Sequence, residues 1–174
     1  MTNSKKDSKV KAKSGDLFII DDVEIKGDKS ELIDGKRIGK IIFFSERYKD
    51  MMGFLFSKST YDSIDQIKAI NNFESIEYDN IILFTSKDII EKDKIYELLG
   101  YNSLVTQDEI ELTRRRIANH IYLLDEAVKM CDDEDYTRYY QQGYGGYASA
   151  VDILNNLEAY RKNLYPVNHP LHIK

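Results

Sequence analysis

The sequence has one cysteine, three histidines and no long apolar run, and each shortage excludes a class of protein. A single cysteine, Cys131, rules out an internal disulfide and fits a reducing cytoplasm. Three scattered histidines, at positions 120, 169 and 172, are too few for a structural zinc site. No apolar run approaches the roughly 20 residues that a membrane-spanning helix needs, and no signal peptide is recognisable. We therefore expect a cytoplasmic protein without membrane contact, bound metal or other cofactor.

Several motifs of well-known enzymes are also missing. The chain has no Gly-rich phosphate loop of the Walker type, no HExxH, no CxxC pair and no GxSxG. The net charge of −5 argues against non-specific coating of nucleic acid. This charge is uneven, because residues 1–58 carry 13 Lys and Arg against 10 Asp and Glu, whereas residues 59–174 carry 12 against 20. A basic face is therefore expected, if anywhere, on the first third of the chain.

The distribution of charged, apolar and turn-forming residues divides the chain into four parts. Residues 1–14 are rich in Lys and Ser and are expected to form a disordered basic tail. In residues 15–105, short aliphatic and aromatic runs bounded by turn residues predict strands: "DLFIIDDVEI" (16–25), "KIIFFS" (40–45), "GFLFS" (53–57) and "YDNIILFTS" (78–86). Ile64, Ile67 and Ile70 are spaced for about two helical turns. Together they predict a small antiparallel β-barrel domain with short helices. Residues 106–165 are predicted to form a C-terminal helical extension, and residues 166–174 a tail. The predicted fold class is α+β: an SH3-like β-barrel followed by a helical hairpin.

The helical extension is predicted from capping residues and apolar spacing. Thr106 and Glu109 match a capping box that opens a helix near Gln107. Apolar residues then recur at helical spacing and would form one apolar stripe over about six turns: Ile110, Ile117, Ile121, Leu124, Val128 and Cys131. A second amphipathic helix is expected to turn inward Val151, Leu154, Leu157 and Leu164. The three arginines at 114–116 would fan around the first helix as a solvated face, with Glu111 as an acidic partner.

Tyrosine is concentrated near the C-terminus, where seven of the 13 tyrosines fall within residues 136–165. Tyrosine rings can stack on unpaired bases, but the neighbouring charges here are mostly acidic and would repel a phosphate backbone. Tyrosine is also favoured in protein interfaces. We therefore favour a protein-contact or dimer surface over RNA stacking. Packing of the two helices within one chain or across two chains stays open.

Three stretches carry a resemblance to a known family. They are "GDLF" (Gly15–Phe18), "GKRIGKII" (Gly35–Ile42) and "GFLFSKS" (Gly53–Ser59), followed by the strand and small helix in "DNIILFTSKDIIEKDKIYELLGYNS". In order and texture they are similar to the MazF/PemK-like toxin family, over about residues 14–120. The resemblance implies a PemK-like β-barrel of the CcdB/PemK type that acts as a metal-independent endoribonuclease. It also implies a homodimer held in check by an antitoxin protein.

The resemblance implies a site as well. In that family the ribose 2′-hydroxyl of single-stranded RNA attacks the adjacent phosphate. By position, Arg37 matches the family's arginine, which would stabilise charge on the phosphate, and Ser57 matches its hydroxyl residue. Lys36, Lys40 and Lys58 would add positive charge for RNA binding.

Other interpretations stay open. Without the resemblance, Arg37 is a hairpin arginine beside the Asp34–Gly35 turn. The same barrel could also serve as a non-catalytic binding module that inhibits a host protein, as phage- or plasmid-type inhibitors do, with the helical extension as its interaction surface. In a third interpretation the helical hairpin is the interacting part and the barrel is its scaffold.

Overall fold

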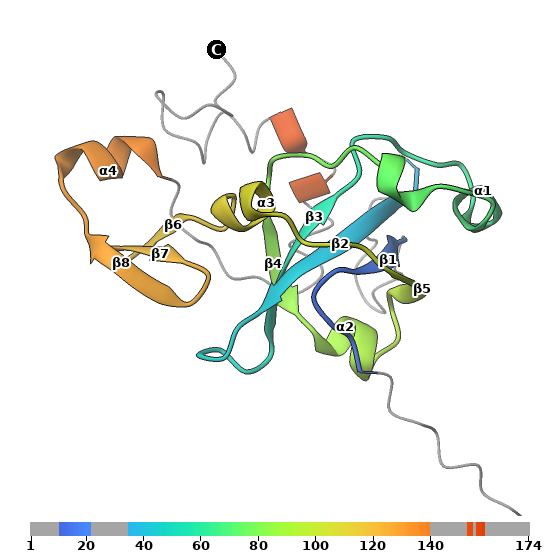
Figure 1. Cartoon of the computed structure of the whole chain (residues 1–174), viewed down its shortest axis with the longest axis horizontal. Coiled ribbons are helices and arrows are strands. Elements are labelled where there is room, and N and C mark those ends of the chain that lie inside the picture. The colour runs from blue at the N-terminus through green and yellow to red at the C-terminus, as the bar shows by residue number, and fades with distance from the viewer. Residues whose placement is uncertain (1–10, 22–34, 140–152, 155, 159–174) are drawn as a thin grey trace, which may run out of the picture.

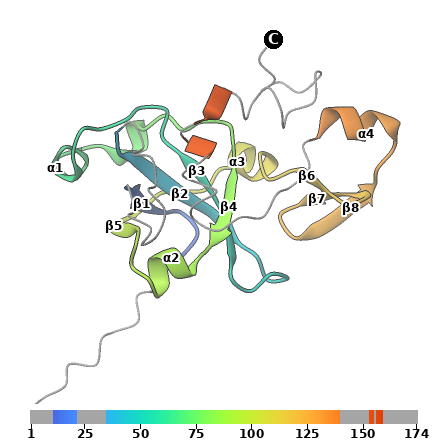
Figure 2. The same cartoon turned by 180° about the vertical axis from the view of Figure 1, so that it is seen from behind.

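The computed structural model describes residues 11–21, 35–139, 153–154 and 156–158 of the chain (Figure 1). The larger sheet consists of β1 (Asp16–Ile20), β2 (Arg37–Phe44), β3 (Met51–Phe56), β4 (Leu83–Ser86) and β5 (Glu97–Asn102). The smaller sheet consists of β6 (Arg115–Ile117), β7 (His120–Leu123) and β8 (Glu126–Met130). The helices are α1 (Ile64–Lys68), α2 (Asp88–Glu91), α3 (Gln107–Glu111), α4 (Asp133–Arg138) and the 3-10 helix η1 (Phe73–Ser75). Seen from either side, the smaller sheet and α4 lie at the opposite end of the molecule from α1 (Figures 1 and 2).

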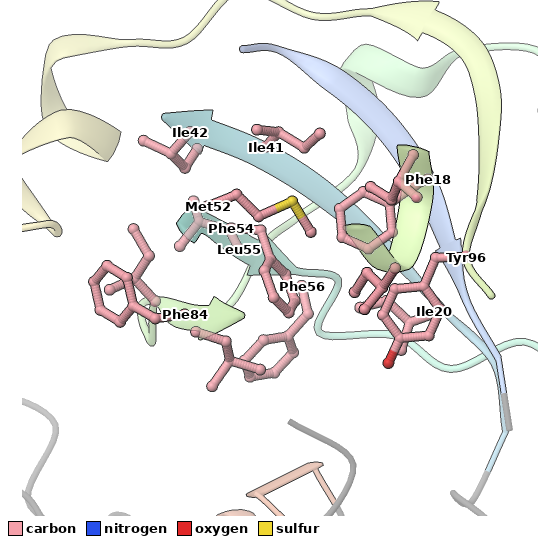
Figure 3. Packing of buried hydrophobic residues seen from close by; sticks show 14 of the residues in the cluster. Phe18, Ile20, Ile41, Ile42, Met52, Phe54, Leu55, Phe56, Phe84 and Tyr96 are labelled. Atoms are coloured by element: carbon pink, nitrogen blue, oxygen red, sulfur yellow. The ribbon is translucent and has the colours of Figure 1, made fainter. Parts of the chain in front are cut away.

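The larger sheet is antiparallel, in the order β4-β3-β2-β1-β5, and it holds the core. All six residues of β3 are buried, as is the interior of β2, so both faces of these strands are covered. Figure 3 shows the main cluster, in which the Phe18 ring meets Phe54 edge-on and stacks on Tyr96. Burial of these aromatic and aliphatic side chains together drives the formation of this part of the fold.

A second, smaller cluster lies under α1. It contains Leu17, Ile19, Ile38 and Ile67. The helix begins where the Ser63 side chain accepts a hydrogen bond from the Gln66 amide, and its buried residue is Ile67. The predicted helical turns near residues 64–70 are therefore confirmed, although α1 is short.

The predicted barrel is wrong, because the larger sheet is open. Closure would require pairing between the edge strands β4 and β5, and the described strands show none. Instead β4 runs into α2, and the carbonyl of Ile89 accepts hydrogen bonds from the amides of Ile95 and Tyr96. This compact turn delivers β5 to the free side of β1, at the far edge of the sheet, so the two edges stay apart.

The predicted C-terminal helical hairpin is also wrong. The capping box of Thr106 and Glu109 is present, but α3 ends at Glu111 and residues 115–130 form three antiparallel strands. The Thr113 hydroxyl, which donates to the Ile110 carbonyl and accepts from the Leu124 amide, ties the end of α3 to the smaller sheet. Of the six residues of the predicted helical stripe, Ile117, Ile121 and Val128 therefore lie on strands, and Ile110 alone lies in a helix.

The three consecutive arginines do not form a solvated face. Arg115 is fully buried, with its guanidinium 5.5 Å from the ring centre of Phe43 and 4.8 Å from that of Phe84. Arg114 has the expected acidic partner, with Nη2 2.7 Å from Glu111 Oε2. In a strand, adjacent side chains point to opposite faces, which sends Arg115 inward between its neighbours.

The ends of the chain are described only in part. Of the second predicted helix, Leu154 is buried in the main core and Leu157 packs partly buried against it. In the predicted basic tail, Ala12 is buried and its amide donates to Glu91. Residues 1–10 of the predicted tail, residues 151–152, 155 and 159–165 of the second predicted helix, and the tail at 166–174 lie outside the described residues. None of the described helices has the length and apolarity to cross a bilayer.

Candidate functional site

Arg37 lies at the first residue of β2, directly after a tight turn. Gly35 has φ of 78°, in the left-handed region, and a Cβ there would lie 2.8 Å from Thr60 Cβ. Next to it, Lys36 and Tyr61 exchange two backbone hydrogen bonds of 2.8 Å. Glycine and this short bridge fix the point at which the chain enters the sheet, and with it the position of Arg37.

The Arg37 guanidinium is held by main-chain carbonyl groups. Nη1 donates to the carbonyl oxygens of Ser57 at 2.7 Å and Lys58 at 2.9 Å, and the group lies 5.6 Å from the centre of the Phe56 ring. Nε is buried and has no hydrogen-bond partner among the described residues. Burial lowers the pKa of Arg37, and the nearby Asp79 carboxylate opposes that effect only in part.

Ser57 lies beside Arg37, but its hydroxyl is turned into the protein. The side chain is fully buried. Its Oγ accepts from the Ile38 amide at 3.1 Å and donates to the Ser59 carbonyl at 2.7 Å. The structure therefore brings the two predicted catalytic residues together through the Ser57 carbonyl, with the hydroxyl closed to solvent.

The three predicted RNA-binding lysines each face a carboxylate. Lys36 pairs with Asp21. Lys40 is buried, with Nζ 2.8 and 2.9 Å from the two oxygens of Glu109, and alternation along β2 puts it on the opposite face from Arg37. Lys58 alone is mostly exposed, and its Nζ lies 3.3 Å from a carboxylate oxygen of Glu77. Of the three lysines, only Lys58 combines a mostly exposed side chain with a contact to Arg37.

Residues 77–79 continue the ladder beside the end of β3. The Lys58 amide donates to the Glu77 carbonyl at 2.9 Å, and the Asp79 amide donates to the Phe56 carbonyl at 2.8 Å. We call Arg37, Lys58, Glu77 and Asp79 the Arg37 row. It joins two cations and two carboxylates at one end of the sheet, over the Phe56 ring.

Glu77 and Asp79 were missed by the sequence reasoning. The available signal was one acidic residue just before the strand predicted at residues 78–86 and another at its second position. Only the pairing with residues 56–58 shows that both lie beside Arg37. The two carboxylates differ in exposure. Asp79 is buried and its Oδ1 accepts from the Ile81 amide, whereas the Glu77 side chain is 78% exposed.

Comparisons with protein-family models, with curated proteins and with solved structures found no match to the chain. Nor does the described part of the chain contain a group of three or more His, Cys, Asp or Glu side chains arranged to hold a metal ion. The arrangement at the Arg37 row combines the guanidinium of Arg37 and the ammonium of Lys58 with two carboxylates. It offers an anion contact at Arg37 and proton-carrying groups beside it.

The tyrosine cluster is visible only at its beginning. Tyr136 is exposed, and the Arg116 guanidinium lies 4.7 Å from its ring centre. Tyr139 is the C-terminal cap of α4. The remaining tyrosines of the cluster, at positions 140, 144, 147, 160 and 165, lie outside the described residues. The expected protein-contact surface stays a prediction.

Proposed function

We propose that the protein is a toxin-like, metal-independent endoribonuclease that cleaves single-stranded RNA by attack of a 2′-hydroxyl on the adjacent phosphate. One observation carries the proposal. Among the four predicted cationic site residues, Arg37 alone has no carboxylate in ion-pair contact within the described residues. A phosphate at the partly exposed guanidinium would compensate a charge that burial disfavours, and the planar fork suits two phosphate oxygens.

The reaction would need stabilisation of charge that develops on the phosphate. The 2′-oxygen forms a bond to phosphorus, the bond to the 5′-oxygen breaks, and a cyclic phosphate and a 5′-hydroxyl result. Arg37, held in place by two carbonyl groups, would meet the equatorial oxygens of the transition state. Ser57 would position Arg37 through its carbonyl, while its hydroxyl secures the strand end. An antitoxin with an acidic segment and a second copy of the chain are the partners that this function implies.

The test is incubation of single-stranded RNA with the protein in EDTA, followed by analysis of the end groups. We expect cyclic phosphate and 5′-hydroxyl ends, and we expect Arg37→Ala to abolish cleavage because the transition-state charge is left without its cation. Arg37→Lys keeps the charge but loses the fork, and we expect a large loss of kcat with the thermal midpoint almost unchanged.

Arg47→Ala is the matched control. Arg47 is an exposed arginine in the turn between β2 and β3, where its Nη1 donates to the Tyr122 hydroxyl. Cleavage by this variant should equal that of the wild type. Retained cleavage in Arg37→Ala, or RNA left intact by the wild-type protein, would contradict the proposal.

A second candidate is a non-catalytic binding module that inhibits a host protein. The buried, doubly bonded hydroxyl of Ser57 favours it, and so does β8, an edge strand of which all five residues are exposed. Val128 and Met130 are 51% and 64% exposed there, and an edge strand can pair with an extended segment of another protein. In that case binding of one host protein should be saturable, should be lost in Met130→Lys and should survive Arg37→Ala.

A further inference from the structure

The ion pair between Lys58 and Glu77 is well placed to move protons next to Arg37. The carbonyl of Lys58 accepts from Arg37 Nη1 at 2.9 Å, so this lysine is joined directly to the proposed phosphate contact. Its ammonium lies 3.3 Å from Glu77, and the two side chains are 55% and 78% exposed. The pair therefore combines a proton donor and a proton acceptor, both exposed to solvent, and its lysine is bonded to Arg37 through the main chain.

We infer that Glu77 is the general base and Lys58 the general acid of RNA cleavage, an assignment that rests on the proposed function. Glu77 takes the proton from the 2′-hydroxyl as its oxygen attacks phosphorus. Lys58 gives a proton to the 5′-oxygen as the bond between phosphorus and that oxygen breaks. The products are the cyclic phosphate and the 5′-hydroxyl, and the two side chains are left as a carboxylic acid and an amine.

The contact between the two residues also resets the site. After cleavage, the carboxylic acid of Glu77 can return its proton to the amine of Lys58 across the 3.3 Å that separates them. The ion pair is thereby restored in the protonation states that the next cycle needs. No further proton donor or acceptor is required, because the proton taken from the 2′-oxygen replaces the one given to the 5′-oxygen.

The other groups nearby are less suited to these roles. Asp79 is 8% exposed and one of its oxygens accepts from the Ile81 amide, so it is not presented to a ligand. The Ser57 hydroxyl is buried and occupied. Lys36 pairs with Asp21, the residue that follows β1, and is only partly exposed. Within the Arg37 row, Glu77 is therefore the exposed proton acceptor and Lys58 the exposed proton donor.

The experiment measures single-turnover cleavage over a range of pH for wild type, Glu77→Gln and Lys58→Gln. General acid and general base catalysis typically contribute 10²- to 10⁴-fold each, and we expect losses of about that size. In Glu77→Gln the acidic limb of the pH–rate profile should disappear, and in Lys58→Gln the basic limb. Binding of RNA that carries 2′-O-methyl groups, which cannot be cleaved, should change little in Glu77→Gln.

A modified substrate separates the two roles. RNA in which sulfur replaces the 5′ leaving oxygen needs no general acid, because a thiolate leaves without a proton. This substrate should restore cleavage by Lys58→Gln and should leave Glu77→Gln impaired. A mere loss of positive charge at position 58 would not be rescued in this way.

The ion pair of Lys68 and Glu97 is the matched control. It joins the same residue types at 2.8 Å, with side chains 48% and 57% exposed, and it links α1 to β5. Lys68→Gln and Glu97→Gln should cleave as the wild type does. Cleavage by Glu77→Gln within about threefold of wild type would overturn the assignment and leave the proposed function standing. RNA left intact by the wild-type protein would overturn both.

Discussion

The two sheets are stabilised in different ways. In the larger sheet, β3 is buried along its whole length and packs among aromatic and aliphatic side chains on both faces. In the smaller sheet, every residue of β8 is exposed. Sheets of three strands need an apolar face or a packing partner to be stable. The comparison indicates that the larger sheet carries its own core, whereas the smaller one depends on its attachment.

That attachment is made by a few polar side chains. Arg115 reaches from β6 over Phe43 and Phe84, and its Nη1 donates to the Leu124 carbonyl at 2.6 Å. Asp125, in the turn between β7 and β8, accepts from the Ser45 hydroxyl at 2.8 Å and from the Glu46 amide at 2.6 Å. Polar contacts of this kind are directional, so removal of one of them should affect the smaller sheet first.

The largest effect is expected from Arg115→Ala. This change leaves a cavity beside two aromatic rings of the main core and removes the hydrogen bond to Leu124. We expect the free energy of unfolding to fall by about 3–5 kcal/mol, as for truncation of a large core side chain. Denaturant unfolding measures this. Arg114→Ala, next to it but paired only with Glu111, should lower the same quantity by less than about 1 kcal/mol. Equal losses in the two variants would contradict the proposed attachment.

A smaller effect is expected from Asp125→Ala. The turn at residues 45–47 would lose a side chain that accepts from Ser45 and Glu46, and we expect a loss of about 1–2 kcal/mol. Hydrogen exchange should show faster opening of β7 and β8 with little change in β2 and β3. Asp125→Asn retains one acceptor oxygen and should lie between Asp125→Ala and the wild type. If exchange increased equally in both sheets, the smaller sheet would not be a separate unit.

The smallest effect concerns pH. Asp132 caps α4, and its hydrogen bond from the Asp135 amide, together with Lys129, lowers the pKa of its carboxyl. Because the folded pKa lies below the unfolded one, the stabilisation is present above the ordinary value and is lost as pH falls through the folded pKa. Acidification should therefore fray α4, as seen in amide resonances of residues 133–138. Asp132→Asn keeps a capping oxygen that does not titrate. In this variant, protonation at position 132 can no longer fray α4, so acidification should fray the helix less than in the wild type. Identical acid fraying in that variant would contradict the explanation.

The difference between the two sheets also explains which parts of the fold could be predicted from the sequence. Strands β1 to β4 follow from short aliphatic and aromatic runs bounded by turn residues, and helix α1 follows from the spacing of Ile64, Ile67 and Ile70. These predictions are confirmed. The prediction of a helix over residues 115–130 was wrong because apolar positions that are spaced for a helix also fit strands joined by tight turns. Those turns place Ala118 and Leu124 at φ of 51° and 54°, a left-handed conformation that glycine usually marks in a sequence. Without glycine, the turns gave no signal.

The candidate site shows the same limit. The position of Arg37 beside Ser57 follows from neighbouring strands and could be inferred from chain order. The position of Glu77 beside Arg37 could not be inferred from chain order. It depends on backbone pairing between residues 77–79 and 56–58, and helix α1 lies between these two segments in the sequence. Pairing between segments so far apart leaves no local pattern in the residues themselves.

The buried ion pair of Lys40 and Glu109 binds the middle of the larger sheet to the segment that leads out of it. Glu109 also accepts from the Thr106 amide, so a single carboxylate both caps α3 and neutralises an ammonium inside the protein. A fragment that stopped at residue 105 would lack the counter-ion of that ammonium, and removal of one partner of a buried ion pair costs about 3–5 kcal/mol. The core of the larger sheet therefore still depends on α3, which follows its last strand, for the neutralisation of one buried charge.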